Sequence, residues 1–306
     1  MKQRAQFVNP NHLCSFNSLT HCLYNLEPFR NCFLETDYNN ISEQPYFFLD
    51  PSLEEIQQPD KIQSKINYAK SAKQFCIDYQ QIFRQMNDPT KRLDLSNLID
   101  TNNIPLLKNG AHDPFTEFLA VLGLLSNSDK PFFMNHFCAY TNKLIQLFTI
   151  PISRNFKDLL YRFFLSPAQS SILSFQLDNQ FYNFQNKRSR TDLMVIHSLP
   201  DILLVSFAYS DEVPIKELQT TVDFTNYVQD HTKSNVFRIN SFILMLHAVH
   251  AIAYVRLMET ADTSNEKWLI CNDIQQKVVG REEVNRDLEF YGQERQAIIG
   301  FYERKP

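Results

Sequence analysis

The chain has 306 residues, of which 43% are hydrophobic and 21% charged, and its formal net charge is -4. A chain of this size can bury the core of one large domain or of two fused lobes. The acidic balance offers no basic surface for nucleic acid, and no apolar segment has the length of a membrane span. We therefore expect a soluble monomer without a nucleic-acid or membrane partner and without a signal peptide.

The first predicted element begins at Cys14. Leu19, Leu23 and Leu26 follow it at helical spacing, and Pro28 is expected to end the pattern, so that Cys14 lies in the first turn of a helix. Backbone amides at a helix N-terminus favour an anion there. The position is typical of a nucleophilic thiolate.

Asn9 precedes Cys14 in a polar turn, and its amide could swing toward the thiol and donate a hydrogen bond to a developing oxyanion. A free cysteine is more often a small buried hydrophobe, which is the better interpretation for Cys22 and Cys271 within their apolar runs. The six cysteines are unclustered, as is typical of a reducing compartment.

Periodicity divides the rest of the chain into a helical first part and a strand-rich second part. Helices are predicted over residues 61–86, 115–125, which Asp113 would cap, and 152–164. Apolar alternation predicts strands over residues 132–149, 175–184, 192–197, 202–208, 237–245 and from 297 onward. These elements predict an α+β fold with the helices gathered on one side of an antiparallel sheet.

Two short apolar strands near the end carry the other residues that a cysteine hydrolase needs. His250 begins the first strand, and Asn272 and Asp273 end the second. If the strands are antiparallel neighbours joined by the polar loop 260–267, Asn272 lies beside the imidazole of His250, and a triad with Cys14 is possible. Asp273 is the alternative orienter, because adjacent residues at a strand end point in opposite directions.

With these motifs the chain resembles the catalytic domain of the ubiquitin-specific proteases, papain-like cysteine peptidases that remove ubiquitin. Residues 9–23 are similar to the family's cysteine box, N-x-G-N-T-C-[YF]-[ML]-N-S-x-L-Q, and residues 250–256 to its histidine box, H-Y-x-A-Y-V-R. Residues 268–273 resemble W-x-x-[FY]-[ND]-D. Further similarities are to the thumb helices at 62–104, an acidic helix start at 111–119, a palm strand at 199–205 and the terminal strand at 297–304.

The resemblance implies Cys14 as nucleophile, His250 as general base, Asn272 as its orienter and Asn9 as an oxyanion donor. It implies one papain-like domain over residues 1–306, with a helical thumb (1–128), reduced fingers with part of the palm (129–198) and a palm with an antiparallel sheet (199–306). It also implies deubiquitinase activity on ubiquitin or polyubiquitin conjugates, without a cofactor. The expected location is the cytoplasm or nucleus, or a host cytosol if the chain comes from a microbe and is delivered there.

Residues expected to contact the substrate depart in part from the family pattern. These residues are Glu117, Asp113, Val249, His247 and Asp273. Val249 replaces the glycine before the histidine and narrows or reshapes a channel built for the two C-terminal glycines of ubiquitin. The acidic helix start has one extra residue, so Asp113 is out of register if Glu117 takes the family's glutamate position. His247 is better interpreted as a structural or channel-lining residue than as the base.

None of the cysteines forms the C-x-x-C pairs that bind zinc in the fingers of many family members, so we expect metal-free, shortened fingers. Three alternative functions remain. The chain could be a protease for another modifier, such as SUMO or an interferon-induced homologue. It could be an inactive ubiquitin-binding scaffold, or a cysteine transferase or unrelated papain-like peptidase.

Overall fold

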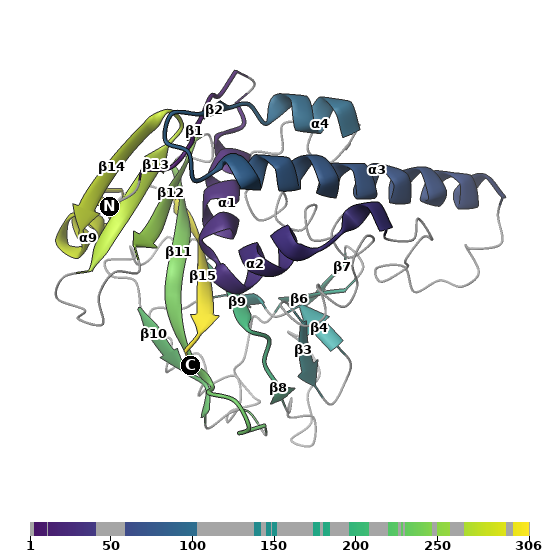
Figure 1. The fold of residues 1–306 in the computed structure, drawn as a ribbon. Helices are drawn as coiled ribbons and strands as arrows, with labels where there is room; N and C mark the ends of the chain where they lie inside the picture. The colour runs from purple at the N-terminus through teal and green to yellow at the C-terminus, as the bar shows by residue number, and fades with distance from the viewer. Residues whose placement is uncertain are drawn as a thin grey trace.

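The computed structural model is an α+β protein, and among its described residues helices dominate before residue 103 and strands after it (Figure 1). It describes residues 3–10, 12–40, 59–102, 138–141, 145–147, 149–151, 174–177, 180–183, 196–207, 220–225, 228, 230–246, 250–257, 266–291 and 296–305. Within these ranges, no helix combines the length and apolar character needed to cross a membrane.

The described helices lie mainly before residue 103. They are α1 (Cys14–Asn25), α2 (Glu27–Glu35), α3 (Pro59–Gln85), α4 (Ser96–Asn102) and α9 (Arg281–Tyr291), with the 3-10 helix η1 (Tyr38–Asn40). Helix α3 closely matches the prediction over residues 61–86.

The described strands form three sheets. A short parallel pair joins β1 (Gln6–Phe7) to β2 (Arg92–Leu93). The large sheet contains β14 (Gln275–Gly280), β13 (Lys267–Asn272), β12 (His250–Leu257), β11 (Val236–Leu246), β15 (Gln296–Arg304), β9 (Ile202–Phe207) and β5 (Thr149–Pro151) in that order, with β10 (Thr221–Asp223) paired to β11. The third sheet contains β7 (Gln180–Asn183), β6 (Ser174–Leu177), β4 (Ile145–Leu147), β3 (Cys138–Thr141) and β8 (Ile196–Ser198).

The large sheet is antiparallel except where β5 pairs with β9 in parallel. Strands β9, β11 and β15 agree with the predicted strands at 202–208, 237–245 and from 297 onward. Two predicted long strands are wrong in extent: 132–149 is divided among β3, β4 and the start of β5, and 175–184 forms the β6–β7 hairpin. The predicted helices at 115–125 and 152–164 lie outside the described residues.

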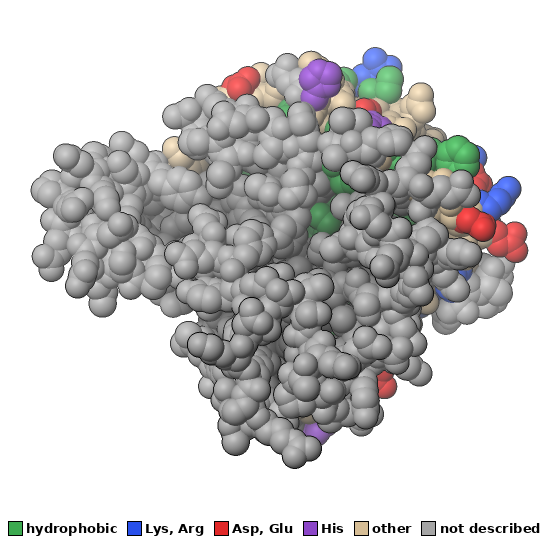
Figure 2. Space-filling model, turned by 180° about the vertical axis from the view of Figure 1, so that it is seen from behind, with side chains coloured by type: hydrophobic (Ala, Val, Ile, Leu, Met, Phe, Trp, Pro, Cys, Tyr) green, Lys and Arg blue, Asp and Glu red, His purple; other side chains and the backbone are tan. Residues whose placement is uncertain are grey.

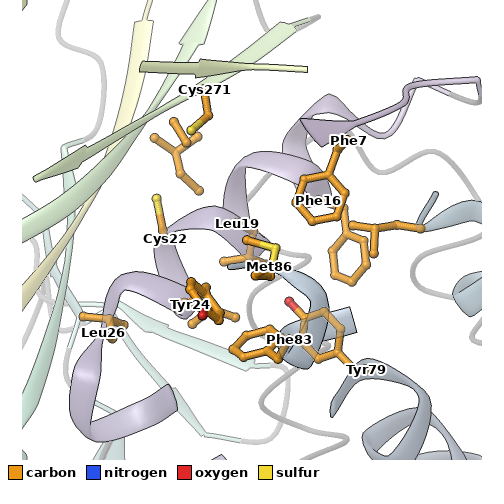
Figure 3. Close-up of a cluster of buried hydrophobic side chains, with 14 of the residues drawn as sticks. Phe7, Phe16, Leu19, Cys22, Tyr24, Leu26, Tyr79, Phe83, Met86 and Cys271 are labelled. Carbon is orange, nitrogen blue, oxygen red and sulfur yellow. The ribbon is translucent and has the colours of Figure 1, made fainter. Parts of the chain in front are cut away.

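Helix α1 is the centre of the core, because all of its residues are buried. Figure 3 shows it between two apolar layers. On one side Phe16 and Tyr24 meet Tyr79 and Phe83 of α3, with ring centroids 5.9 Å apart for Phe16–Tyr79 and 5.4 Å for Tyr24–Phe83. On the other side, α1 packs against β11, β12 and β13. A helix enclosed in this way holds its first residue in a fixed place relative to the sheet.

The prediction that Pro28 ends the first helix is wrong, because α1 already ends at Asn25 and Pro28 lies in the first turn of α2. Proline is favoured there because its fixed φ suits a helix start and its missing N–H would have no partner in that turn. Pro28 therefore begins a helix.

The sequence predicted that the helices gather on one side of the sheet. This prediction is wrong, because α9 lies on the face opposite α1. Ala253 and Val255 of β12 belong to the core around α1. Tyr254 between them points to the other face, where its hydroxyl donates to Asp287 of α9 at 3.0 Å. Phe242 stacks on Tyr254 with centroids 4.5 Å apart on that same face.

The far end of α1 is anchored at an irregularity in β11. The register of β11 against β15 shifts between Ile239 and Ser241, so that Asn240 is an extra residue, as in a β-bulge. Asn25 at the end of α1 donates to Asn240 Oδ1 at 2.7 Å, and Asn240 donates to Glu303 Oε2 at 2.7 Å. These buried amides fix α1 to the sheet at the end opposite Cys14.

On the face shown in Figure 2, described acidic and basic side chains lie near one another along the upper and right edges of the view.

Candidate active site

The candidate site lies where the start of α1 meets one end of the β12–β13 pair. These strands are antiparallel, as expected from the sequence, so the first residue of β12 and the last of β13 lie at the same end. They are His250 and Asn272. Helix α1 packs on β12 and begins at Cys14, as predicted. The fold thus brings together three residues that the sequence places far apart.

His250 interacts with both other residues. Its Nε2 lies 2.8 Å from Asn272 Oδ1, and its ring also has a hydrogen bond to the side chain of Cys14. The Cys14 hydrogen bond is the largest cause that raises the pKa of His250 to about 9, and the bond to Asn272 and the charge of Asp273 add to it against the effect of burial. At neutral pH this imidazole is therefore largely protonated.

The imidazole of His250 lies between the thiol of Cys14 and the amide oxygen of Asn272, and in its protonated form it can donate to both. Nε2–H donates to Asn272 Oδ1, which leaves Nδ1–H for the sulfur of Cys14. Cys14 is only 3% exposed, and α1 begins there without a side-chain cap, so the first backbone N–H groups are directed toward the same point. The arrangement can support nucleophilic attack by sulfur followed by proton transfer from the imidazolium.

Asn9 is held in place and does not swing freely, in contrast to the expectation from the sequence. Its Oδ1 accepts the backbone N–H of Leu13 at 2.5 Å, and its Nδ2 donates to Asp273 Oδ2 at 3.1 Å. The amide nitrogen has two hydrogens, and among the described residues only Asp273 accepts one. The second N–H has no acceptor among the described residues.

Asp273 accepts hydrogen bonds from the side-chain amides of Asn9 and Asn17, whereas the partner of His250 is Asn272. Besides Asn9, the buried Asn17 donates to Asp273, with 3.2 Å between Nδ2 and Oδ1. Asp273 has a φ of 51°, in the left-handed region that favours glycine. Asp is one of the few residues other than glycine that adopt this conformation readily, so the turn can carry the carboxylate that Asn9 and Asn17 bind.

The contribution of Asn17 was not predicted from the sequence. Its Nδ2 also donates to the Val8 carbonyl at 3.3 Å, so that this one amide joins the start of the chain to the β13–β14 turn. The available signal was its spacing, because a residue three positions after Cys14 lies on the same side of a helix.

Four predicted substrate-contact residues lie outside the described residues: Glu117, Asp113, Val249 and His247. Their roles stay predictions. Across the described ranges, no group of three or more His, Cys, Asp or Glu side chains could hold a metal ion.

Two other thiols have an environment unlike that of Cys14. Both Cys22 and Cys271 are fully buried, as their apolar runs predict. Burial raises the pKa of Cys271 to about 12 and that of Cys22 further. These thiols stay protonated at neutral pH and pack as small apolar side chains.

Compared with models of known protein families and with curated proteins, the chain matches no family model and no curated protein.

Proposed function

We propose that the protein is a cysteine deubiquitinase with a papain-like arrangement of thumb, reduced fingers and palm. The observation that carries the proposal is His250, which is hydrogen-bonded to the Cys14 side chain and, at 2.8 Å, to Asn272. In this interpretation, α1 to α4 belong to the thumb and β9 to β15 to the palm. The active site lies between them.

In the proposed reaction, Cys14 Sγ attacks the carbonyl carbon of the C-terminal glycine of ubiquitin, and the carbonyl oxygen becomes an oxyanion. The free N–H of Asn9 and the backbone N–H of Cys14 bind this oxygen, and each such donor contributes about 3 kcal/mol to transition-state stabilisation. His250 then gives its proton to the leaving lysine amine as the C–N bond breaks. Water gives a proton to His250 and attacks the thioester carbonyl, the C–S bond breaks, and ubiquitin leaves with a free C-terminal carboxylate, which restores Cys14 and protonated His250.

Two features support ubiquitin as the source of the acyl group. The first is the resemblance of the cysteine and histidine boxes to those of the ubiquitin-specific proteases. The second is the shelter of Cys14, which is 3% exposed. A thiol this deeply placed selects an acyl chain without bulky side chains, and the two terminal glycines of ubiquitin meet that requirement.

The geometry favours an enzyme over an inactive scaffold. A scaffold has no need for an imidazole held between a thiol and an amide. A protease for another modifier with two terminal glycines would use the same site and is the second candidate.

The experiment is the reaction of the purified protein with ubiquitin that carries a C-terminal propargyl group, followed by mass spectrometry. We expect one ubiquitin to be added to the wild type and none to Cys14→Ala. Cys32→Ala is the matched control, because Cys32 is a half-buried thiol away from the site and its replacement should leave labelling unchanged. Labelling of Cys14→Ala would contradict the proposal. So would the absence of labelling in a folded wild-type protein. A panel of probes built on other modifiers separates the second candidate.

A further inference from the structure

The segment that carries Asn9 is attached to the helical part of the molecule by its backbone. We call residues 4–9 the N-terminal strap; it contains β1. Ala5 N–H donates to Met86 O at 3.0 Å, and Val8 N–H donates to Leu93 O at 2.9 Å. One edge of the strap is thus paired with the end of α3 and with β2.

The end of the strap at Arg4 and Ala5 is attached to the large sheet by the side chain of Gln276. The Oε1 of Gln276, on β14, accepts the Arg4 N–H at 3.0 Å, and its Nε2 donates to the Ala5 carbonyl at 2.9 Å. A carboxamide has the same donor and acceptor as a peptide group. Gln276 therefore pairs with the strap as one residue of a neighbouring strand would.

The direction of the Gln276 side chain follows from the register of the sheet. Gln276 lies opposite Cys271 on β13, and Cys271 belongs to the core around α1. Side chains of opposite residues lie on the same face of a sheet, so Gln276 also points to the face on which α1 and the strap lie. Figure 1 shows β1 near the β13–β14 end of the sheet.

The strap therefore has two attachments to the same hairpin. Asp273 in the β13–β14 turn accepts from Asn9 at one end of the strap, and Gln276 holds Arg4 and Ala5 at the other end. The strap is also paired with β2, and the Val8 carbonyl accepts from Asn17. Gln276 is the attachment at the Arg4 end, and together with these contacts it determines where the strap places Asn9.

We propose that Gln276 is a positioning residue that sets the location of the oxyanion donor Asn9 by holding the N-terminal strap to β14. The catalytic effect of Gln276 rests on the proposed function, whereas its attachment of the strap does not. Gln276 acts through the strap and touches no reacting atom.

The test compares Gln276→Met with Gln275→Met. Methionine has nearly the same length as glutamine but cannot pair with both backbone groups, and Gln275 is the exposed neighbour on the same strand. Hydrogen exchange is followed at single residues by NMR. We expect exchange to rise about tenfold at Arg4 and at Leu13, whose N–H is bound by Asn9 Oδ1, only in Gln276→Met. Exchange in α3 should stay unchanged and shows that the fold is intact.

Steady-state cleavage of a ubiquitin conjugate gives the second readout. A displaced oxyanion donor weakens transition-state binding but not substrate binding, so kcat should fall about tenfold in Gln276→Met with KM within about twofold of the wild type. Unchanged exchange at Arg4 and Leu13 overturns the proposal, whatever the substrate. Faster exchange with unchanged kcat overturns the positioning role. A wild type that fails the labelling experiment refutes the proposed function, while the exchange experiment still decides whether Gln276 holds Asn9.

Discussion

Asn272 Oδ1 lies 2.8 Å from Nε2 of His250, and this hydrogen bond is one of the interactions that raise the pKa of the imidazole to about 9. It fixes the ring so that its other nitrogen faces Cys14. The pairing of β12 with β13 produces this contact, and the raised pKa of His250 leads to a prediction of how activity depends on pH.

The first prediction concerns the alkaline limit of activity. The reactive form needs protonated His250, so kcat/KM should be lost as the pH rises through about 9. Asn272→Ala removes one stabiliser of the imidazolium and should move this limit to lower pH, with a large but incomplete loss of kcat. Gln275→Ala, on the exposed neighbour, is the control. An unchanged limit in Asn272→Ala would contradict the assignment of the titration to His250.

The second prediction concerns the turn at Asp273. Asp273→Gly and Asp273→Ala both remove the acceptor for Asn9 and Asn17, so both should lower kcat about a hundredfold. Only glycine adopts the left-handed backbone without strain, so the glycine variant should be more stable than the alanine variant by about 1 kcal/mol. Urea unfolding measures the difference. Equal stability of the two variants would show that the turn is not strained.

The third prediction concerns acid stability. His21 is fully buried, has no hydrogen-bond partner for its ring nitrogens among the described residues, and lies against Phe7 with Arg4 nearby. Burial, followed by the charge of Arg4, lowers the pKa of His21 to about 3. The unfolded chain binds the proton more strongly, so this contribution to stability is complete above about pH 6.5 and is lost as the pH falls toward 3.

The measurement is the free energy of unfolding at pH 6.5 and 4.5. His21 should account for a loss of about 2 kcal/mol between these values. His21→Leu should lack this part of the loss, whereas the control His231→Leu, at an exposed site, should keep it. Identical pH dependence in His21→Leu and the wild type would rule out His21 as the acid-sensitive group.

The fourth prediction concerns Arg304 in β15. Its guanidinium donates to the carbonyls of Pro200 and Leu199 on one side and to Asn235 Oδ1 and the Ser234 carbonyl on the other. Lysine cannot reach these acceptors together, so Arg304→Lys should lower the free energy of unfolding by about 3 kcal/mol. Lys305→Ala is the control at the next residue. A loss below about 1 kcal/mol would show that the carbonyls find other partners.

Elements with a strong apolar period could be predicted from the sequence, whereas α9 and β14 could not. Helix α9 buries only Val284 and Leu288, a narrow stripe within a mostly polar segment. Strand β14 is an edge strand on which Val279 is buried, so it shows little alternation. Because α9 was not predicted, nothing in the sequence indicated that a helix also covers the face of the sheet opposite α1.

The residue types of the site could be predicted because each lies in a short local pattern. Their connections could not, because Asn9 and Asp273 are 264 positions apart and meet only through the fold. The sequence left Asn272 and Asp273 as alternatives for one role. In the structure they occupy different positions, and only the geometry of the turn separates them.

The anchoring of Asn25 at the β11 bulge limits how the chain could change in length near the site. Helix α1 is held by Asn240 at its last residue and enclosed along its sides, so it cannot slide or rotate to absorb an inserted or deleted residue. The strap before it is equally fixed, by β2 and Gln276. Because Asn9 also binds the Leu13 N–H, an inserted or deleted residue before Cys14 would displace either the strap or the start of α1.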